Sequence, residues 1–238
     1  MFSDTQPDHS EALMRVSAFE RQHGKRQVHG DADAGATQLS ALNPSLLQDL
    51  LRFEQRHRPG VGLDLLEVLA AALRHNRGLL LHLQMDYRVI PVTVLPASRQ
   101  VHSPLGPTQW SALRLSDLRV LRVEPARGPL ADTPTIAPQD LGPLLWEMAL
   151  RGARADLLPE IAGIASYRVS PGAALPTLDM GGTMAAAVSQ LRVQTTPLHE
   201  IARWEGFDRD RAMRLLNALY LQSALIVSRS HPGAVSGL

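Results

Sequence analysis

A set of arginines near the end of the chain offers the side chains best suited to molecular recognition. Arg209, Arg211 and Arg214 follow one another within seven residues of sequence, Asn217 lies a turn later, and Arg229 lies beyond them. A guanidinium binds carboxylate, phosphate or the edge of guanine through paired hydrogen bonds, and an asparagine amide can read adenine. These five residues are therefore the candidate contacts for a partner protein or for DNA.

Acidic residues are interleaved with these arginines. Glu205, Asp208 and Asp210 place negative charge beside the side chains that would face a DNA groove. Phosphate contacts dominate DNA affinity, so these carboxylates would oppose binding. Mixed charge on an exposed helix face favours a solvated surface or a protein-binding surface over DNA readout.

The elements that position the arginines are readable from the spacing of residues. Thr196 and Pro197 begin one helix, Gly206 provides a tight turn, and Asp208 caps a longer helix. An apolar stripe along the longer helix predicts its buried face, and a short apolar run after it predicts a strand. The stripe is Met213, Leu216 and Leu219, and the strand is Leu225-Ile226-Val227.

This order, with a preceding helix from Thr183 to Leu191, resembles the winged helix-turn-helix superfamily over residues 183–229. The resemblance implies either DNA binding or a protein-interaction module. After the strand, Pro232-Gly233 and a short tail at 232–238 leave little room for a second wing strand. The sequence therefore predicts a truncated wing.

Two amphipathic helices are expected in the first half of the chain. Asn43-Pro44 begins a helix with Leu46, Leu47, Leu50 and Leu51 on one face. A second helix is expected from Asp64 to His75, with Gly78 closing it. A short helix is also expected at Ser10–Gln22, followed by a mobile Gly/Asp/Ala-rich linker.

Period-two alternation then predicts an antiparallel sheet covered by the two helices. The expected strands are residues 79–85, 89–95, 99–102 and 118–123. Pro91 suggests an edge position or a bulge. His82 alternates with leucines, so we expect it on the opposite face as a surface or edge residue.

Residues 64–103 resemble the beginning of PATAN-type domains, which accompany bacterial response regulators. The similar features are an apolar helix, a polar break with Gly78, two strands and the closing Arg99-Gln100-Val101-His102. This resemblance implies a signalling adaptor that binds another protein and has no catalysis of its own.

The organisation expected is a two-domain α+β protein. A flexible segment (1–42) precedes an α+β domain (43–125), and a proline-rich linker (126–137) leads to a helical domain (138–231) that ends in the winged-helix-like unit. Within the helical domain we expect helices at Pro143–Arg151 and Asp156–Ala165 and a strand at residues 167–169.

Composition limits the remaining function classes. The formal net charge is +1, which disfavours a whole-surface nucleic-acid binder, and the absence of cysteine excludes zinc ribbons, thiol catalysis and disulfide scaffolds. There is no apolar run long enough to span a bilayer and no secretory signal pattern. We therefore expect a bacterial cytoplasmic protein without membrane contact.

Residues with catalytic potential form no recognisable site. The cluster His23, His29, Asp31 and Asp33 fits no standard metal spacing. The neighbours His102 and Ser103 would need a third group and the right orientation. We expect no catalytic, cofactor or metal site, and a non-enzymatic regulatory adaptor that acts through protein contacts. The alternatives are a DNA-binding transcription regulator and an enzyme with an unrecognised site, and homodimerisation stays open.

Overall fold

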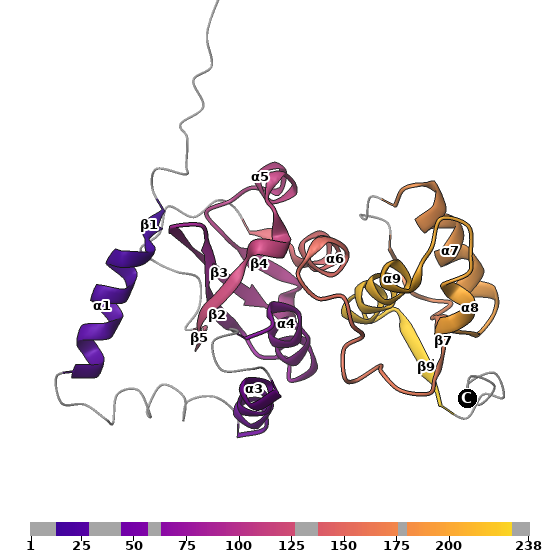
Figure 1. Cartoon of the computed structure of the whole chain (residues 1–238), viewed down its shortest axis with the longest axis horizontal. Helices are drawn as coiled ribbons and strands as arrows, with labels where there is room; N and C mark the ends of the chain where they lie inside the picture. The colour runs from indigo at the N-terminus through magenta and orange to yellow at the C-terminus, as the bar shows by residue number, and fades with distance from the viewer. Residues whose placement is uncertain (1–12, 29–43, 57–62, 127–137, 176–179, 230–238) are drawn as a thin grey trace, which may run out of the picture. The chain divides into compact units, whose positions relative to one another are not determined.

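The computed structural model describes residues 13–28, 44–56, 63–126, 138–175 and 180–229. The chain divides into two compact units, treated separately below. Unit 1 comprises residues 1–113 and 117–140, and unit 2 comprises residues 114–116 and 141–238. Each unit combines an antiparallel sheet with helices, which confirms the α+β class (Figure 1).

The elements of the first part of the chain follow in order: β1 (Met14–Arg15), α1 (Val16–Val28), α3 (Pro44–Arg56), α4 (Leu65–Arg74), β2 (Leu79–Met85), β3 (Arg88–Leu95), η2 (Pro96–Ser98), β4 (Gln100–His102), α5 (Pro107–Ala112), η3 (Leu115–Asp117), β5 (Arg119–Pro125) and β6 (Gln139–Asp140). The second part contains α6 (Leu141–Arg151), β7 (Ser166–Val169), α7 (Gly182–Val193), β8 (Thr196–Pro197), α8 (Leu198–Ile201), α9 (Arg209–Leu221) and β9 (Leu225–Ser228).

The sheet of unit 1 grows from the β2–β3 hairpin. Asp86 adopts a left-handed φ of 52° in the connecting turn. The strand order is β5-β2-β3-β4-β6, with β1 also paired to β3. A shift of register between His82 and Leu83 leaves Leu121 as an extra residue in β5, which forms a bulge.

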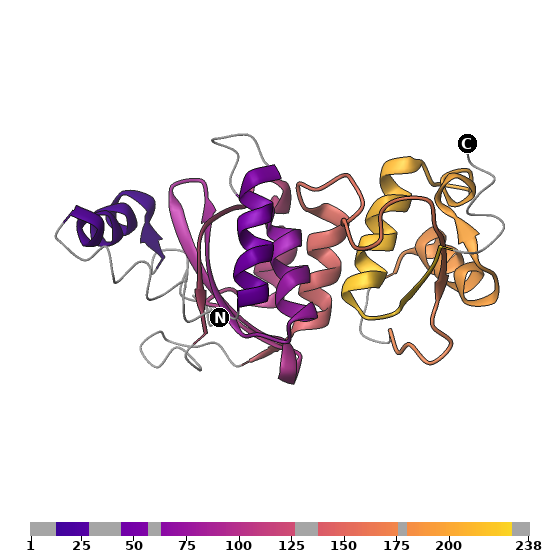
Figure 2. The same ribbon diagram turned by 90° about the horizontal axis from the view of Figure 1, so that it is seen from below.

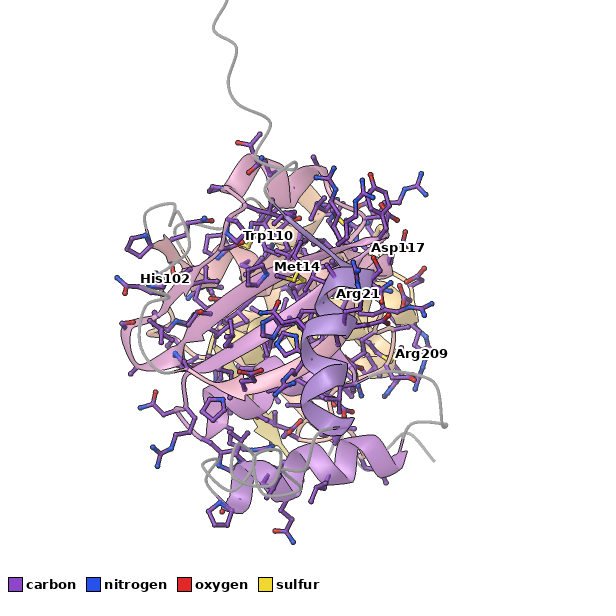
Figure 3. All side chains as sticks on the ribbon, turned by 90° about the vertical axis from the view of Figure 1, so that its left-hand side faces the viewer. Met14, Arg21, His102, Trp110, Asp117 and Arg209 are labelled. Carbon is purple, nitrogen blue, oxygen red and sulfur yellow. The ribbon has the colours of Figure 1, made fainter. Side chains whose placement is uncertain are left out.

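Helices cover both faces of this sheet. Leu79, Leu81 and Leu83 are at most 1 % exposed, and α3 and α4 run side by side over one face of the sheet (Figure 2). Helix α1 lies over the strands on the other face, with Met14 just before its first turn (Figure 3). His82 therefore points away from the leucines, as predicted, but it lies beneath α1 and is half-buried. The expectation that His82 is a surface residue is wrong.

The two helices expected before the sheet are present. The Asp64 carboxylate caps α4 by accepting from the Leu66 N–H at 2.8 Å. The chain turns out of α4 at Asn76, whose φ is 49°, so Gly78 does not close the helix as predicted. Asp49 on α3 links the helices by accepting from Arg74 and His75. Leu51 is 45 % exposed and does not share the buried face predicted for it.

Pro91 lies within β3, a strand with neighbours on both sides along other parts of its length, but its own position is locally an edge, one of the two alternatives predicted. It stands opposite His82 in β2. The hydrogen bond from Val16 N–H to Tyr87 O shows that odd-numbered residues of β3 direct their backbone groups toward β1 and β4. The described pairings with β1 reach Val89 and those with β4 begin at Thr93. Proline, which has no N–H, therefore stands where no neighbouring strand is recorded among the described residues.

Helix α1 corrects two further expectations. It begins at Val16, later than predicted, and extends to Val28, into the segment expected to be a mobile linker. Residues 29–43 and the linker at 127–137 lie outside the described residues. Within the described ranges, no helix has the length and apolar character needed to cross a bilayer.

Unit 2 contains a three-stranded antiparallel sheet in the order β8-β7-β9. The strand predicted after the long helix is present as β9, and its partner is β7, which precedes all three helices of the helix-turn-helix segment. The second strand that the sequence could not place after β9 is thus supplied from earlier in the chain.

The helix expected at Asp156–Ala165 is absent. Those residues form turns around Leu158–Ile161, where the N–H groups of Ile161 and Ala162 both donate to the Leu158 carbonyl. Gly163 has a φ of 99°, which is incompatible with a continuing helix. The apolar residues that suggested a helix are instead buried by tertiary packing, with Leu158 and Ile161 fully enclosed.

Candidate functional site

The turn and cap that position the candidate arginines form as predicted. Gly206 adopts a left-handed φ of 72° between α8 and α9. The Asp208 carboxylate then accepts from the Arg211 N–H at 2.7 Å and caps α9. Helix α7 begins one residue before Thr183, with Gly181 at its cap, and α8 begins at Leu198, after Pro197. The side chains beyond this turn have sharply different environments.

Asn217 is fully buried, so its predicted place on a contact surface is wrong. Its Oδ1 accepts from the Leu158 N–H at 2.9 Å, and its Nδ2 donates to the Asp156 carbonyl at 2.9 Å. Both partners are backbone groups of the irregular segment that replaces the expected helix. The amide therefore holds this segment against α9 and is inaccessible to a partner.

Arg214 also serves the interior of unit 2. Its Nη1 donates to the carbonyls of Leu150 and Gly152, at 3.3 and 2.8 Å. These contacts satisfy carbonyls at the end of α6 that lack helical partners. Its Nε donates to the Asp210 carboxylate at 2.8 Å, and 19 % of the side chain is exposed. Arg214 joins α9 to α6, and most of its hydrogen-bonding capacity is used there.

Arg211 stabilises the turn that precedes its own helix. Its Nη1 donates to the Gly206 carbonyl at 2.7 Å, and its Nη2 donates to the Thr183 hydroxyl at 2.9 Å. The guanidinium carbon lies 5.2 Å from the centre of the Phe207 ring, within cation–π range. The hydrogen bonds of Arg211 therefore hold the turn against the beginning of α7.

Arg229, just after β9, lies across the loop formed by residues 160–164. Its Nη1 donates to the Ala162 carbonyl at 2.8 Å, and its Nη2 donates to the Glu160 carbonyl at 3.0 Å. Gly163 leaves room for this arrangement, because a Cβ there would lie 3.3 Å from Arg229 Nη1. The residue stays exposed, and no carboxylate pairs with it among the described residues.

Arg209 is exposed, and its side chain has no hydrogen bond or ion pair within the described ranges. Its charge acts on the same residue as that of Arg229. Burial raises the pKa of the Tyr167 hydroxyl, and the positive charges of Arg229 and Arg209 oppose that rise. Both guanidiniums are thus close enough to Tyr167 to act on it. We call Arg209 and Arg229 the arginine pair.

The surroundings of the arginine pair combine apolar and charged side chains. Ile164 is 55 % exposed, directly after the glycine that Arg229 covers, and Ile226 in β9 is 47 % exposed. Glu205 and Asp208 are exposed at the beginning of α9. No sequence signal joins Arg229 to the 160–164 loop, because the contact connects segments far apart in the chain. Sequence reasoning therefore missed Ile164.

The adjacent residues His102 and Ser103 are not arranged as a base and a nucleophile. The Ser103 hydroxyl accepts from the Leu105 N–H at 3.1 Å, which stabilises the local turn. His102 is 8 % exposed, and its Nδ1 has no hydrogen-bond partner in the part of the chain that the structure describes.

A second histidine group was not expected from the sequence. The rings of Phe19 and His23 on α1 stack at 4.2 Å, and Phe19 lies 4.9 Å from the ring of His82. Burial lowers the pKa of His82 to about 4; Glu124 acts against this shift, and His23 and Arg122 add to it. Phe19, His23 and His82 form the ring cluster that holds α1 on the sheet. The spacing of Phe19 and His23 by four residues was the available signal.

Within the described ranges, no group of three or more His, Asp or Glu side chains could hold a metal ion. No protein-family model, curated protein sequence or solved structure matches this chain significantly.

Proposed function

We propose that this protein is a non-enzymatic regulatory adaptor of the bacterial cytoplasm that binds another protein through the arginine pair of unit 2. One observation carries the proposal. Of the five candidate residues, Asn217, Arg214 and Arg211 make internal contacts, and Arg229 stays exposed although it binds two backbone carbonyls, whereas Arg209 is exposed without a recorded partner in the described residues. The recognition capacity that remains is therefore a small basic surface.

The composition of this surface favours a protein partner over DNA. A helix that reads DNA needs several side chains free at its N-terminal end, together with phosphate contacts. In α9 only Arg209 meets this requirement, and the exposed carboxylates of Glu205 and Asp208 stand beside it. A guanidinium next to exposed isoleucines suits a carboxylate on a partly apolar protein segment.

The proposal is tested by charge reversal at one residue. Tagged Arg209→Glu protein and wild-type protein are used to capture partners from lysate of the source cells, and the captured proteins are quantified by mass spectrometry. Arg203→Glu is the matched control, because Arg203 is also an exposed arginine of unit 2 with no recorded side-chain contact in the described residues. We expect one or more partners to be lost with Arg209→Glu and retained with Arg203→Glu.

A DNA titration separates the competing function. Binding of wild-type protein to random duplex DNA is measured across a salt series beginning at low ionic strength. The adaptor proposal expects no salt-dependent binding above that of the Arg209→Glu variant. Strong binding that weakens steeply with salt would support a DNA-binding regulator instead.

A further inference from the structure

Strand β9 forms one edge of the sheet in unit 2, because β7 is its only partner in the described residues. Which of its backbone groups face β7 follows from one hydrogen bond. The Ser170 N–H donates to the Ala224 carbonyl at 2.8 Å, and these two residues continue the register of the β7–β9 pair. Hydrogen-bonded and non-hydrogen-bonded pairs alternate along an antiparallel ladder.

The alternation assigns each residue of β9 a direction. Ile226 and Ser228 occupy hydrogen-bonded pairs with β7, so their N–H and C=O groups point into the sheet. Leu225 and Val227 occupy the intervening pairs, so their N–H and C=O groups point outward. No hydrogen bond to these outward groups occurs within the described residues. The edge thus offers two donors and two acceptors to a further strand.

Positive charge surrounds this edge. Arg229 follows β9 directly, and the charges of Arg229 and Arg209 both act on Tyr167 of the neighbouring strand β7. Arg168 stands opposite Ile226 in β7, and its guanidinium donates to the Arg192 carbonyl. None of Arg229, Arg209 and Arg168 is paired with a carboxylate among the described residues. A strand added here would meet these positive charges, with the exposed carboxylates of Glu205 and Asp208 near Arg209 alone in sequence.

We propose that the outer edge of β9 binds an extended acidic segment of the partner protein, which adds a fourth strand to the sheet. Backbone hydrogen bonds to Leu225 and Val227 would supply affinity, as in other complexes formed by strand addition. Carboxylates of the segment would pair with the arginine pair, so this inference rests on the proposed adaptor function. Ile226, 47 % exposed on the outer face, adds a contact for apolar residues that alternate with the acidic ones.

The experiment uses the full chain and a defined probe. The probe is a fluorescein-labelled peptide of about eight residues, a usual strand length, that alternates glutamate and valine. Binding is measured by fluorescence anisotropy at low salt, and amide exchange is followed by NMR with and without peptide. We expect the amides of Ile226 and Ser228 to exchange slowly in both states, whereas those of Leu225 and Val227 become slow only with peptide.

Matched changes test the two parts of the interaction. Val227→Pro removes one outward N–H and leaves the bonds to β7 intact, so it should weaken peptide binding about tenfold, the loss of roughly one hydrogen bond to a charged or buried partner. Arg209→Glu should weaken binding at least as much, and Arg203→Glu should leave it unchanged. Peptides with lysine for glutamate, or with alternate amides N-methylated, should fail to bind, and these controls do not depend on the folding of a variant.

Several outcomes would overturn the proposal. One is peptide binding without protection of Leu225 and Val227. A second is protection of the Leu225 and Val227 amides when the protein alone is concentrated, which would indicate that the edge binds a second copy of this chain. A third is protection of the same amides when duplex DNA is added. Peptide binding that appears only after deletion of residues 230–238 would indicate that the edge of β9 binds a segment of this chain and not a partner protein. If Val227→Pro retains the captured partner that Arg209→Glu loses, strand addition is wrong and the adaptor function stands; if Arg209→Glu loses none, the adaptor surface itself is wrong.

Discussion

The two sheets of this protein are both antiparallel, but they differ in how their faces and edges are covered. In unit 1, α3 and α4 cover one face and α1 covers the other (Figures 1 and 2). The outer strand β5 carries a bulge and meets Leu63 through a bridge to Val120. In unit 2, β9 has neither a bulge nor an outer neighbour in the described residues, and its Ile226 is half exposed.

This difference underlies the proposal that contacts with other molecules are made at unit 2. Bulges and covering segments protect sheet edges from unwanted pairing. Unit 1 has such protection at β5, whereas unit 2 has arginines at β9. Asn217 and Arg214 make hydrogen bonds in the interior of unit 2. Arg209 and the outer edge of β9 are the parts proposed to contact other molecules. The predictions below test this division between interior and surface.

The largest effect is expected from Asn217→Ala. The change leaves the buried Leu158 N–H without its acceptor and removes one of two hydrogen bonds to the Asp156 carbonyl, which keeps the bond from Arg154 Nε. The unsatisfied N–H costs about 1–3 kcal/mol and the lost hydrogen bond about 1 kcal/mol, so we expect unit 2 to lose about 2–4 kcal/mol of unfolding free energy. Urea denaturation followed by tryptophan fluorescence measures this loss, because Trp146 and Trp204 both lie in unit 2. A loss below 0.5 kcal/mol would contradict the interior role, since about ±0.5 kcal/mol is usual for surface changes.

Gly152→Ala should have the next largest effect. A Cβ at this position would lie 2.3 Å from the Met148 carbonyl oxygen, so the end of α6 must shift. We expect a loss of about 1–3 kcal/mol, as for other overpacked sites, measured by the same denaturation. Gly172→Ala is the matched control, because no atom lies within 4 Å of its added Cβ. Equal stability of the two variants would show that α6 ends with more freedom than its contacts imply.

The covering of unit 1 by α1 should depend on pH. The pKa of His82 is lowered to about 4 beneath α1 and returns toward its ordinary value of 6.5 when α1 detaches. The neutral ring thus favours the covered state, whose stability is complete above pH 6.5 and declines as pH falls toward 4. We expect a decline of about 1 kcal/mol after allowance for partial solvent screening.

Amide exchange in α1 measures this covering. Exchange should accelerate between pH 6.5 and 4 beyond its intrinsic pH dependence, and His82→Gln should abolish the extra acceleration. His199→Gln is the control, because the His199 side chain is 41 % exposed. An unchanged pH profile in His82→Gln would show that the effect does not come from His82.

The smallest effect on stability is expected from Arg209→Glu. The side chain is exposed and has no recorded partner in the described residues, so the unfolding free energy should change by less than about 0.5 kcal/mol. Thermal and urea denaturation check this expectation. A larger loss would mean that Arg209 supports the interior, as Arg214 does, and would remove the contrast on which the proposed function depends.

Local sequence signals predicted much of the fold. Asp208 was identified as a helix cap, and alternation placed β2 and β3 within one residue of their observed bounds. These features depend on residues close together in sequence. The absent helix at 156–165 failed because tertiary contacts decided its conformation, including the amide of Asn217 fifty-nine residues away from Leu158.

The candidate site was predicted less well for the same reason. Helical spacing placed Arg209, Arg211, Arg214 and Asn217 near one another, but spacing within α9 does not tell which neighbours surround that helix. The packing of α6 against α9 buries Arg214 and the segment at 156–158 buries Asn217. A residue type that suits recognition also suits internal hydrogen bonding, and only the partners distinguish the two roles.

The central position of β7 determines how unit 2 can be divided. Strands β8 and β9 each pair with β7, and they do not pair with each other. A fragment limited to residues 183–229, the extent of the winged-helix resemblance, would therefore contain two strands and no sheet. The smallest autonomous fragment must begin before Ser166, and its folding has to wait for a contact between distant segments, which is a slow kind of step.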